Sequence, residues 1–136
     1  MNWNDVIPHL NGLLHVATAD SGGAPHISKV AAAVDGATIW IATMRTSGKA
    51  RNVAANPRVA LMWDSGSEAY VWGDAELVDD IEEKRRIWDS GLLPYDPAMF
   101  FGTVDNPLLV LLRVTPTRAT VLTMGPDGGT RGTWSA

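Results

Sequence analysis

Short runs of apolar residues recur along the chain, and glycine, proline, asparagine or aspartate separates most of them. Runs of this length that are rich in valine, isoleucine and aromatic residues are typical of β-strands. We predict strands at residues 13–19, 25–34, 37–43, 59–63, 68–78 and 108–114, with residues 119–124 either continuing the last strand or adding another. Three segments hold better helix formers and a capping residue near their start. We therefore predict helices at residues 4–10, 46–56 and 79–90.

The residues between the strands favour tight reversals of the chain. Asp35-Gly36 is the strongest hairpin signal, and we predict a type I′ turn there. Gly73 lies in the middle of a predicted strand, which indicates a bulge or a close approach by another backbone or a ligand. Residues 92–107 form an irregular segment with several aromatic residues. Residues 125–136 are rich in glycine, and we expect a mobile tail that Trp134 could anchor.

Six short strands joined by hairpin turns, with helices between some of them, predict a mainly β fold of the α+β type. The expected architecture is an antiparallel β-barrel with flanking helices. A doubly wound parallel sheet is the alternative, but only one helix connects two strands in the way that such a sheet needs. The length of 136 residues and the lack of a linker predict a single domain over residues 1–136.

Composition and charge exclude several classes of function. The net charge is −4 and the isoelectric point is near 5.2, which weighs against nucleic acid or an anionic membrane surface as the partner. Cysteine is absent, so disulfides, thiolate metal sites and cysteine catalysis are excluded. No apolar run approaches the roughly 20 residues that span a bilayer. The first ten residues lack the pattern of a signal peptide, so we expect a cytoplasmic protein.

Thr43, Ser47 and Lys49 lie together where a predicted strand ends and a predicted helix begins. Two hydroxyls, one cation and the free N–H groups at the start of a helix can hold a phosphate. The alternative is an ordinary capped helix with a solvated lysine. Spacing alone favours this alternative, because serine and threonine are common N-caps.

Other residue types give weaker indications. His9, His15 and His26 are scattered without the spacing of a metal site, so we expect isolated histidines and no bound metal. The serines show no nucleophile-elbow pattern, and we assign no catalytic residue. Aromatic residues gather between Trp88 and Phe101, where they could form core, the walls of a flat pocket or a subunit interface. Their concentration in a loop favours the interface.

Several short motifs follow one another in a recognisable order. Thr43 precedes Ser47-Gly48-Lys49, and Asn56-Pro57-Arg58-Val59-Ala60-Leu61 comes after the predicted helix. Further on are Tyr70-Val71-Trp72-Gly73-Asp74-Ala75-Glu76-Leu77, Trp88, Phe100-Phe101-Gly102 and Thr115-Pro116. This order resembles the pyridoxamine-phosphate-oxidase-like flavin-binding split barrels, whose pattern is Thr, Ser-Arg-Lys, a helix and Asn-Pro-x-Val-x-Leu. The resemblance covers about residues 5–122 and is strongest to the general stress protein 26 branch.

The resemblance implies a six-stranded antiparallel split β-barrel, a homodimer, and FMN in a cleft between the subunits. By position, Thr43 and Lys49 would hold the ribityl-phosphate end of the cofactor, with Ser47 and the Gly48 N–H nearby. Residues 28–33 would run along the edge of the flavin. Glu68 falls where the family often has a glutamine near the dimer interface, and a solvated strand end is an equal alternative for it. The candidate cofactor-binding residues are Ser28, Lys29, Val30, Thr43, Ser47, Gly48, Lys49 and Glu68.

Some positions depart from the family pattern. Ser28, Ala33 and Gly48 stand where pyridoxamine oxidases have basic phosphate ligands, so we do not expect vitamin B6 oxidation. Lys29 or Arg45 could replace part of the lost charge. Related proteins use the deazaflavin F420, which stays the alternative cofactor. The expected function is a flavin-dependent oxidoreductase that acts on a small molecule, and the alternative is a non-catalytic flavin-binding stress or sensor protein.

Overall fold

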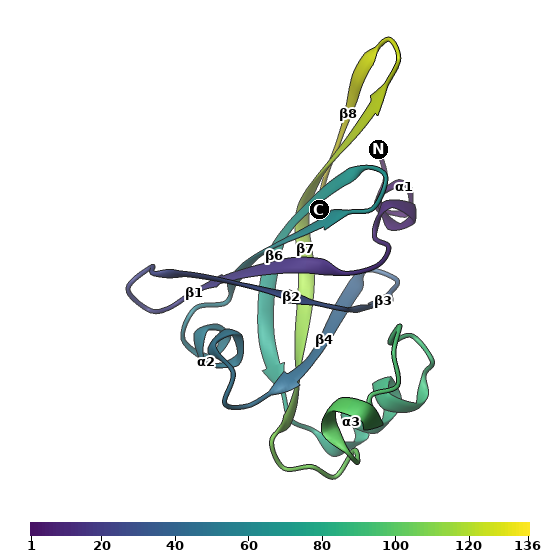
Figure 1. Cartoon of the computed structure of the whole chain (residues 1–136). Helices are drawn as coiled ribbons and strands as arrows, with labels where there is room; N and C mark the ends of the chain where they lie inside the picture. The colour runs from purple at the N-terminus through teal and green to yellow at the C-terminus, as the bar shows by residue number, and fades with distance from the viewer.

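One curved antiparallel sheet forms the body of the molecule (Figure 1). The computed structural model describes residues 1–136. Seven strands follow the order β2-β1-β5-β6-β7-β4-β3, and β8 pairs with β7. The strands are β1 (Leu14–Ala19), β2 (Pro25–Val30), β3 (Ala33–Asp35), β4 (Thr38–Met44), β5 (Arg58–Asp64), β6 (Glu68–Val78), β7 (Leu109–Gly125) and β8 (Gly128–Ser135). The mainly β fold class that the sequence predicts is confirmed.

The sheet curls because two consecutive strands of the chain, β2 and β3, form its two opposite edges. The sequence predicts a single strand at residues 25–34, but the structure divides it into β2 and β3. β2 pairs only with β1, and β3 pairs only with β4, so these strands close the two ends of the sheet order. Two residues, Ala31 and Ala32, join them. The result is a split barrel, and the division is one reason why the structure has eight strands rather than the predicted six.

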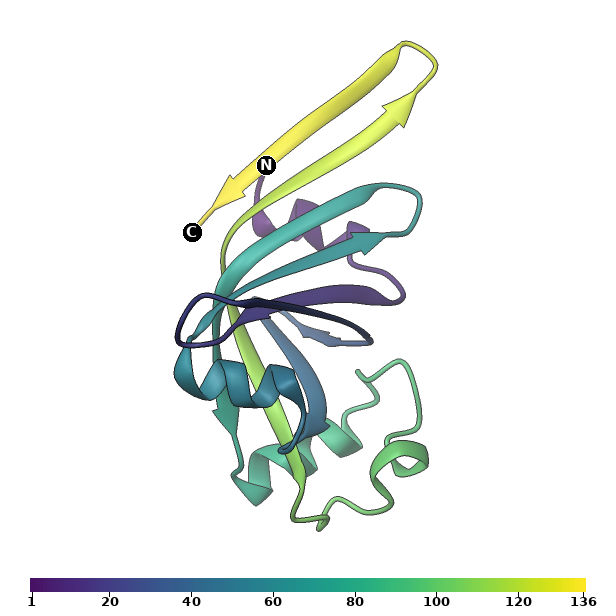
Figure 2. The same ribbon diagram turned by 60° about the vertical axis from the view of Figure 1, so that its left-hand side comes forward.

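The glycine-rich end of the chain supplies the other additional strand. In place of the expected mobile tail, residues 128–135 pair with residues 118–125 of β7 and form β8. Figure 2 shows this β7–β8 hairpin projecting from the barrel. The Trp134 ring packs on the Trp3 ring with 4.9 Å between centroids, which anchors the base of the hairpin. β7 offered an unpaired edge, and pairing with it outweighs the low strand propensity of glycine.

Four helices and one short 3-10 segment precede or connect the strands. They are α1 (Trp3–Val6), η1 (Ile7–His9), α2 (Gly48–Ala55), α3 (Ile81–Asp89) and α4 (Ala98–Phe101). The predicted helices at 46–56 and 79–90 are therefore confirmed as α2 and α3. α2 packs against β1, β2 and β6, whereas α3 and the segment after it lie at one end of the barrel (Figure 2).

The apolar core fills the interior of the barrel. Its largest buried side chains include Trp63, Leu14, Ile39 and Leu112, which are all nearly inaccessible to solvent. A second, smaller apolar cluster lies under α3, where Ile87 packs with a group that contains Ala33, Trp40, Val78, Leu93 and Leu111. This second cluster fixes α3 and the segment after it to the barrel end, because buried apolar area is the main stabilising term.

Two glycines show why the backbone follows this path. The prediction of a close approach at Gly73 is confirmed: the register of β6 against β7 shifts there, and a Cβ atom on Gly73 would lie 2.5 Å from the Thr115 carbonyl oxygen. The prediction of a type I′ turn is wrong. Asp35 pairs with Thr38, which leaves Gly36 and Ala37 as the turn, and only Gly36 has a positive φ. A type I′ turn needs positive φ at both central positions.

Candidate functional site

Hydroxyl groups and unpaired backbone donors meet at the start of α2. Thr43 is the next-to-last residue of β4, and its hydroxyl donates to Ser47 Oγ at 3.1 Å. Ser47 is the N-cap of α2, and its Oγ also accepts from the Ala50 N–H at 3.2 Å. Because Ser47 Oγ accepts both bonds, its own hydroxyl proton stays available to a ligand. The amides of Gly48 and Lys49 have no partner within the helix, as at any helix start.

Lys49 adds a cation whose charge has no counterpart within the chain. Its side chain is half-buried, and burial lowers the pKa of its ammonium group. None of the six ion pairs of the chain includes Lys49. A half-buried cation without a carboxylate, beside the positive end of a helix, is an arrangement that favours an anion.

A cavity lies at β2, β4 and the segment after α3. It has a volume of about 520 Å³, within the range of small-molecule sites. Lys29 and Val30 of β2 line it, as does Ala42, the neighbour of Thr43 on β4. The Ser28 hydroxyl oxygen, next along β2, is buried and has no hydrogen-bond partner. Three of the residues that the sequence assigns to the flavin edge thus lie in or next to one cavity.

Aromatic side chains from the segment after α3 form another part of the cavity lining. Tyr95, Phe100 and Phe101 line it together with Pro94. The Tyr95 and Phe100 rings meet edge to face, with centroids 5.1 Å apart, and burial raises the pKa of the Tyr95 hydroxyl. The sequence left these aromatics open between core, pocket wall and interface. Within one chain they line the pocket, and Phe100 is also 65% exposed.

Glu68 is not brought to this site within one chain. It is the first residue of β6, whereas Val78 at the other end of β6 shares a row with Leu111 and Ala42. Ten residues of strand separate the two ends, or about 30 Å. The Tyr70 hydroxyl donates to Glu68 at 3.0 Å, and this hydrogen bond is the main cause that raises the pKa of Tyr70.

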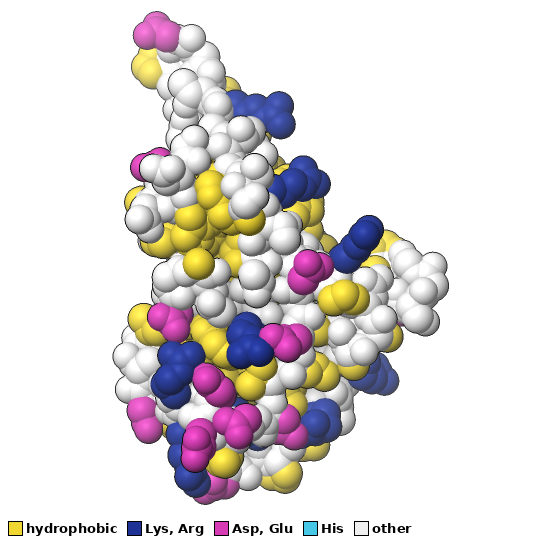
Figure 3. All heavy atoms as spheres, turned by 180° about the vertical axis from the view of Figure 1, so that it is seen from behind, with side chains coloured by type: hydrophobic (Ala, Val, Ile, Leu, Met, Phe, Trp, Pro, Cys, Tyr) yellow, Lys and Arg dark blue, Asp and Glu magenta, His cyan; other side chains and the backbone are white.

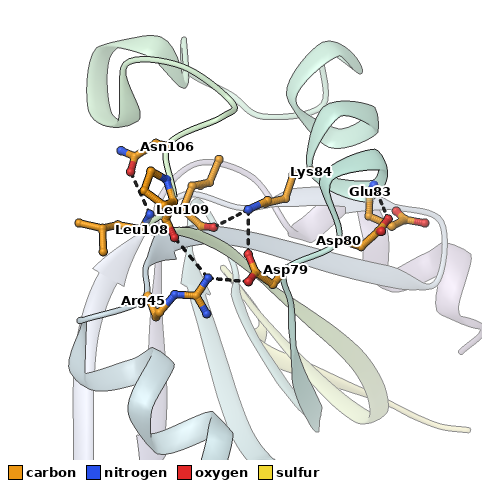
Figure 4. Close-up of polar contacts among 9 residues, drawn as sticks. Arg45, Asp79, Asp80, Glu83, Lys84, Asn106, Leu108 and Leu109 are labelled. Atoms are coloured by element: carbon orange, nitrogen blue, oxygen red, sulfur yellow. Dashed lines mark hydrogen bonds and ion pairs between the residues drawn. The ribbon is translucent and has the colours of Figure 1, made fainter.

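Arg45, which the sequence offers as a replacement for the lost phosphate-binding charge, is paired within another cluster (Figure 4). Its guanidinium donates to Asp79 at 2.6 Å and to the Pro107 carbonyl at 3.2 Å. Asp79 also accepts from the buried Lys84 ammonium at 2.8 Å, and Lys84 donates to the Leu109 carbonyl at 3.0 Å. Hydrogen bonds from Lys84 first, and from Arg45 second, lower the pKa of Asp79.

This ionic cluster, formed by Arg45, Asp79 and Lys84, is a feature that sequence reasoning missed. It joins the end of β4, the end of β6, α3 and the start of β7. It therefore fixes both chain segments that flank the aromatic wall. The sequence signal was present only as charges near element ends, and nothing in their spacing along the chain relates position 45 to position 79.

The charge pattern of the surface and the character of the helices give little further information about the site. Figure 3 shows acidic and basic side chains intermingled around the end of the molecule that carries α3, with apolar patches above them. No group of three or more His, Asp or Glu side chains lies close enough together to hold a metal ion. None of the helices has the length and apolar character needed to cross a bilayer.

A split barrel with a ligand-sized cavity and a helix start that carries free donors is the class of protein that these features define. The chain belongs to the pyridoxamine 5'-phosphate oxidase family, whose sequence profile matches residues 7–123. General stress protein 26 of Bacillus subtilis (strain 168) is 30% identical over 118 residues, which cover 82% of this chain and 79% of that protein. The resemblance read from the sequence is therefore confirmed.

Solved structures show the same fold. General stress protein 26 from Bacillus anthracis str. Sterne has a TM-score of 0.76 at 17% identity, covering 98% of this chain and 97% of that chain. An F420 reductase has a TM-score of 0.57 at 27% identity, covering 79% of this chain and 87% of that chain.

Proposed function

We propose that this protein binds FMN and acts as a flavin-dependent oxidoreductase on a small molecule. The observation that carries the proposal is a half-buried Lys49 without a carboxylate partner at a helix start, in a chain that also has a cavity of about 520 Å³ lined by Lys29 and Val30 of β2. A phosphate group and a flat apolar ring need those two environments. Membership of the pyridoxamine 5'-phosphate oxidase family supports a flavin-type cofactor in general.

The residues at the start of α2 fit the phosphate end. Lys49 would neutralise its charge, and the Gly48 N–H and the Ser47 hydroxyl would donate to its oxygens. The buried Ser28 hydroxyl has no partner in the chain and is available to the same ligand. Thr43 would act on the phosphate indirectly. Its hydroxyl donates to Ser47 Oγ and so holds Ser47 in place.

The residues of the cavity fit the ring end. Lys29 and Val30 line the cavity, together with the aromatic side chains of Tyr95, Phe100 and Phe101. Aromatic walls bind a flat ring by stacking and exclude water from it. A bound flavin would supply the redox chemistry, and the chain would supply position, exclusion of water and the field of Lys49 and Lys29.

We further propose that the protein works as a cytoplasmic homodimer. Several large apolar side chains around the cavity are strongly exposed in the single chain: Leu13 is 56%, Ile27 66%, Phe100 65% and Met99 80% exposed. Clusters of this kind typically mark an interaction surface. A second subunit would cover this surface and close the open side of the cavity.

The absorbance spectrum of the purified protein, with mass identification of the released cofactor, tests the proposal. We expect an oxidised-flavin spectrum and the mass of FMN. A deazaflavin spectrum and the mass of F420 would keep the site and replace the cofactor, and the likeness to an F420 reductase makes this the second candidate. Protein that binds neither compound after reconstitution would contradict the proposal.

Anaerobic stopped-flow spectroscopy separates an oxidoreductase from a non-catalytic binding protein. The chain has no nicotinamide-binding motif, so we expect slow, unselective reduction of the bound flavin by NADPH, followed by reoxidation with an added acceptor. If no donor reduces the bound flavin while free flavin is reduced under the same conditions, the binding-protein alternative holds.

A further inference from the structure

The ring of His26 lies directly against the start of α2. A Cβ atom on Gly48 would lie 3.0 Å from His26 Nε2 and 3.2 Å from Cδ2, which is closer than side chains normally pack. His26 comes from β2, and its imidazole makes no hydrogen bond or ion pair within the chain. The ring thus lies closer to position 48 than a Cβ atom normally packs, and it would have to shift to admit one.

The backbone does not explain the glycine at this position. Gly48 is the first residue of α2, and it is not among the glycines with positive φ. Glycine weakens a helix relative to other residues, so a helix start without a backbone requirement normally carries another residue. The close approach of the imidazole disfavours a larger residue there, which the exposed His26 ring would have to make room for by shifting.

The register of the strands fixes which side of β2 faces the helix. His26 pairs with Thr18 of β1, and Thr18 Oγ1 accepts from Asn52 Nδ2 at 3.0 Å. Gly48 and Asn52 are one turn apart on α2, so His26 and Thr18 meet the same face of the helix. Ser28 lies two residues after His26, and alternation along a strand puts its buried, unpartnered hydroxyl on the same side of β2.

Three kinds of donor therefore occur where β2 meets the start of α2. They are the imidazole of His26, the free amides at the start of α2, and the ammonium of Lys49 next to Gly48. An imidazole donates one hydrogen bond when neutral and two when protonated, and all of these groups favour an oxyanion. No carboxylate pairs with His26 or Lys49.

We propose that His26 is a ligand of the cofactor phosphate. Gly48 has no side chain to donate to the phosphate, and the His26 imidazole supplies a donor from β2 instead. This donor makes the site selective for a phosphate monoester over an uncharged ribityl end. This assignment rests on the proposed function, because it concerns the same cofactor. It also makes the two positions interdependent: the effect of a substitution at Gly48 on phosphate binding depends on the residue at position 26.

The affinities of FMN and riboflavin, measured side by side by fluorescence quenching, test the assignment. His26→Ala should lower the ratio of FMN to riboflavin affinity by about tenfold, the scale of one charge-assisted hydrogen bond, and leave riboflavin unchanged. Gly48→Ala should also lower the ratio, because the added Cβ displaces the ring. Combining His26→Ala with Gly48→Arg should restore it, because the space that the ring leaves admits a cation on α2.

Controls separate the possible outcomes. His15→Ala removes a histidine from β1, where His15 pairs with Lys29 on the other face of the sheet, and it should leave the ratio unchanged. Inorganic phosphate added to cofactor-free protein should shift the imidazole NMR signals of His26 and not those of His9. Thermal unfolding of each variant shows whether it folds.

Three results would overturn the assignment, and the third would overturn the proposed function as well. A wild-type ratio well above one that His26→Ala leaves unchanged would remove His26 from the site. Equal loss of both ligands in His26→Ala would make the ring a packing partner of α2 only. A wild-type ratio of one would show that the phosphate is not read at all, and the proposed function would then fail together with the assignment.

Discussion

Replacing Asp79 by asparagine should destabilise the protein more than the loss of an exposed ion pair normally does. The change removes the carboxylate from Lys84, whose side chain is only 6% exposed, and leaves its ammonium with the Leu109 carbonyl alone. Breaking a fully buried pair typically costs about 3–5 kcal/mol. Asp79 itself is 51% exposed, so water replaces part of what is lost. The exposed Arg45 pair adds about 0.5 kcal/mol, and we expect a total of about 2–3 kcal/mol.

Equilibrium urea unfolding at a fixed protein concentration measures this cost. Asp105→Asn is the matched control, because it breaks the Arg85–Asp105 pair, whose side chains are 55% and 70% exposed. The control should lose less than about 1 kcal/mol. If Asp79→Asn costs no more than Asp105→Asn at neutral pH, the ionic cluster does not stabilise the barrel end and the reasoning is wrong.

The pH dependence gives an independent check on the same pair of variants. Hydrogen bonds from Lys84 and Arg45 hold the pKa of Asp79 below its usual value of 3.8. A carboxylate with a lowered pKa in the folded state stabilises fully above its unfolded pKa, and this contribution is lost as the pH falls through the folded pKa. The difference between wild type and Asp79→Asn should be constant from pH 5 to pH 8 and shrink below about pH 4. A difference that persists undiminished at pH 2 would contradict an electrostatic origin.

Three further predictions follow from the site and the fold. Lys49→Ala should weaken FMN by about 1.5–3 kcal/mol and leave riboflavin unchanged, and an unaltered FMN affinity in fluorescence quenching would remove Lys49 from the site. Gly73→Ala should cost about 3 kcal/mol in urea unfolding, because its Cβ would lie 2.5 Å from the Thr115 carbonyl oxygen, and a neutral effect would show that β6 and β7 can separate there. Sedimentation at micromolar concentration should give twice the 14.6 kDa chain mass, whereas a monomer with cofactor bound would refute the proposed interface.

Local patterns predicted the elements of this fold well where one segment decides its own structure. The bounds predicted for the strand at 68–78 are those of β6, because alternation and flanking turns mark both ends. The Ser47 cap and the Asn56-Pro57 stop likewise predict α2 to within two residues at its start and one at its end. In such places, the hydrogen-bonding choices of a few neighbouring residues determine the outcome.

Features that depend on distant partners were missed. The division of residues 25–34 into β2 and β3 depends on two different partner strands, β1 and β4. The strand at residues 128–135 depends on the free edge of β7. In the candidate site, the sequence grouped Thr43, Ser47 and Lys49 because they are neighbours in the chain. It could not relate His26 to Gly48, or Arg45 to Asp79, because tertiary packing alone brings those pairs together.

The affinities of wild-type protein for FMN and riboflavin, measured in parallel on cofactor-free protein, test the central claim most directly. The two compounds share the ring and the ribityl chain and differ only in the phosphate. If the start of α2, with Lys49 beside it, receives that phosphate, FMN should bind at least about tenfold more tightly, as one or more charge-assisted hydrogen bonds imply. Equal affinities would contradict a phosphate site at the start of α2.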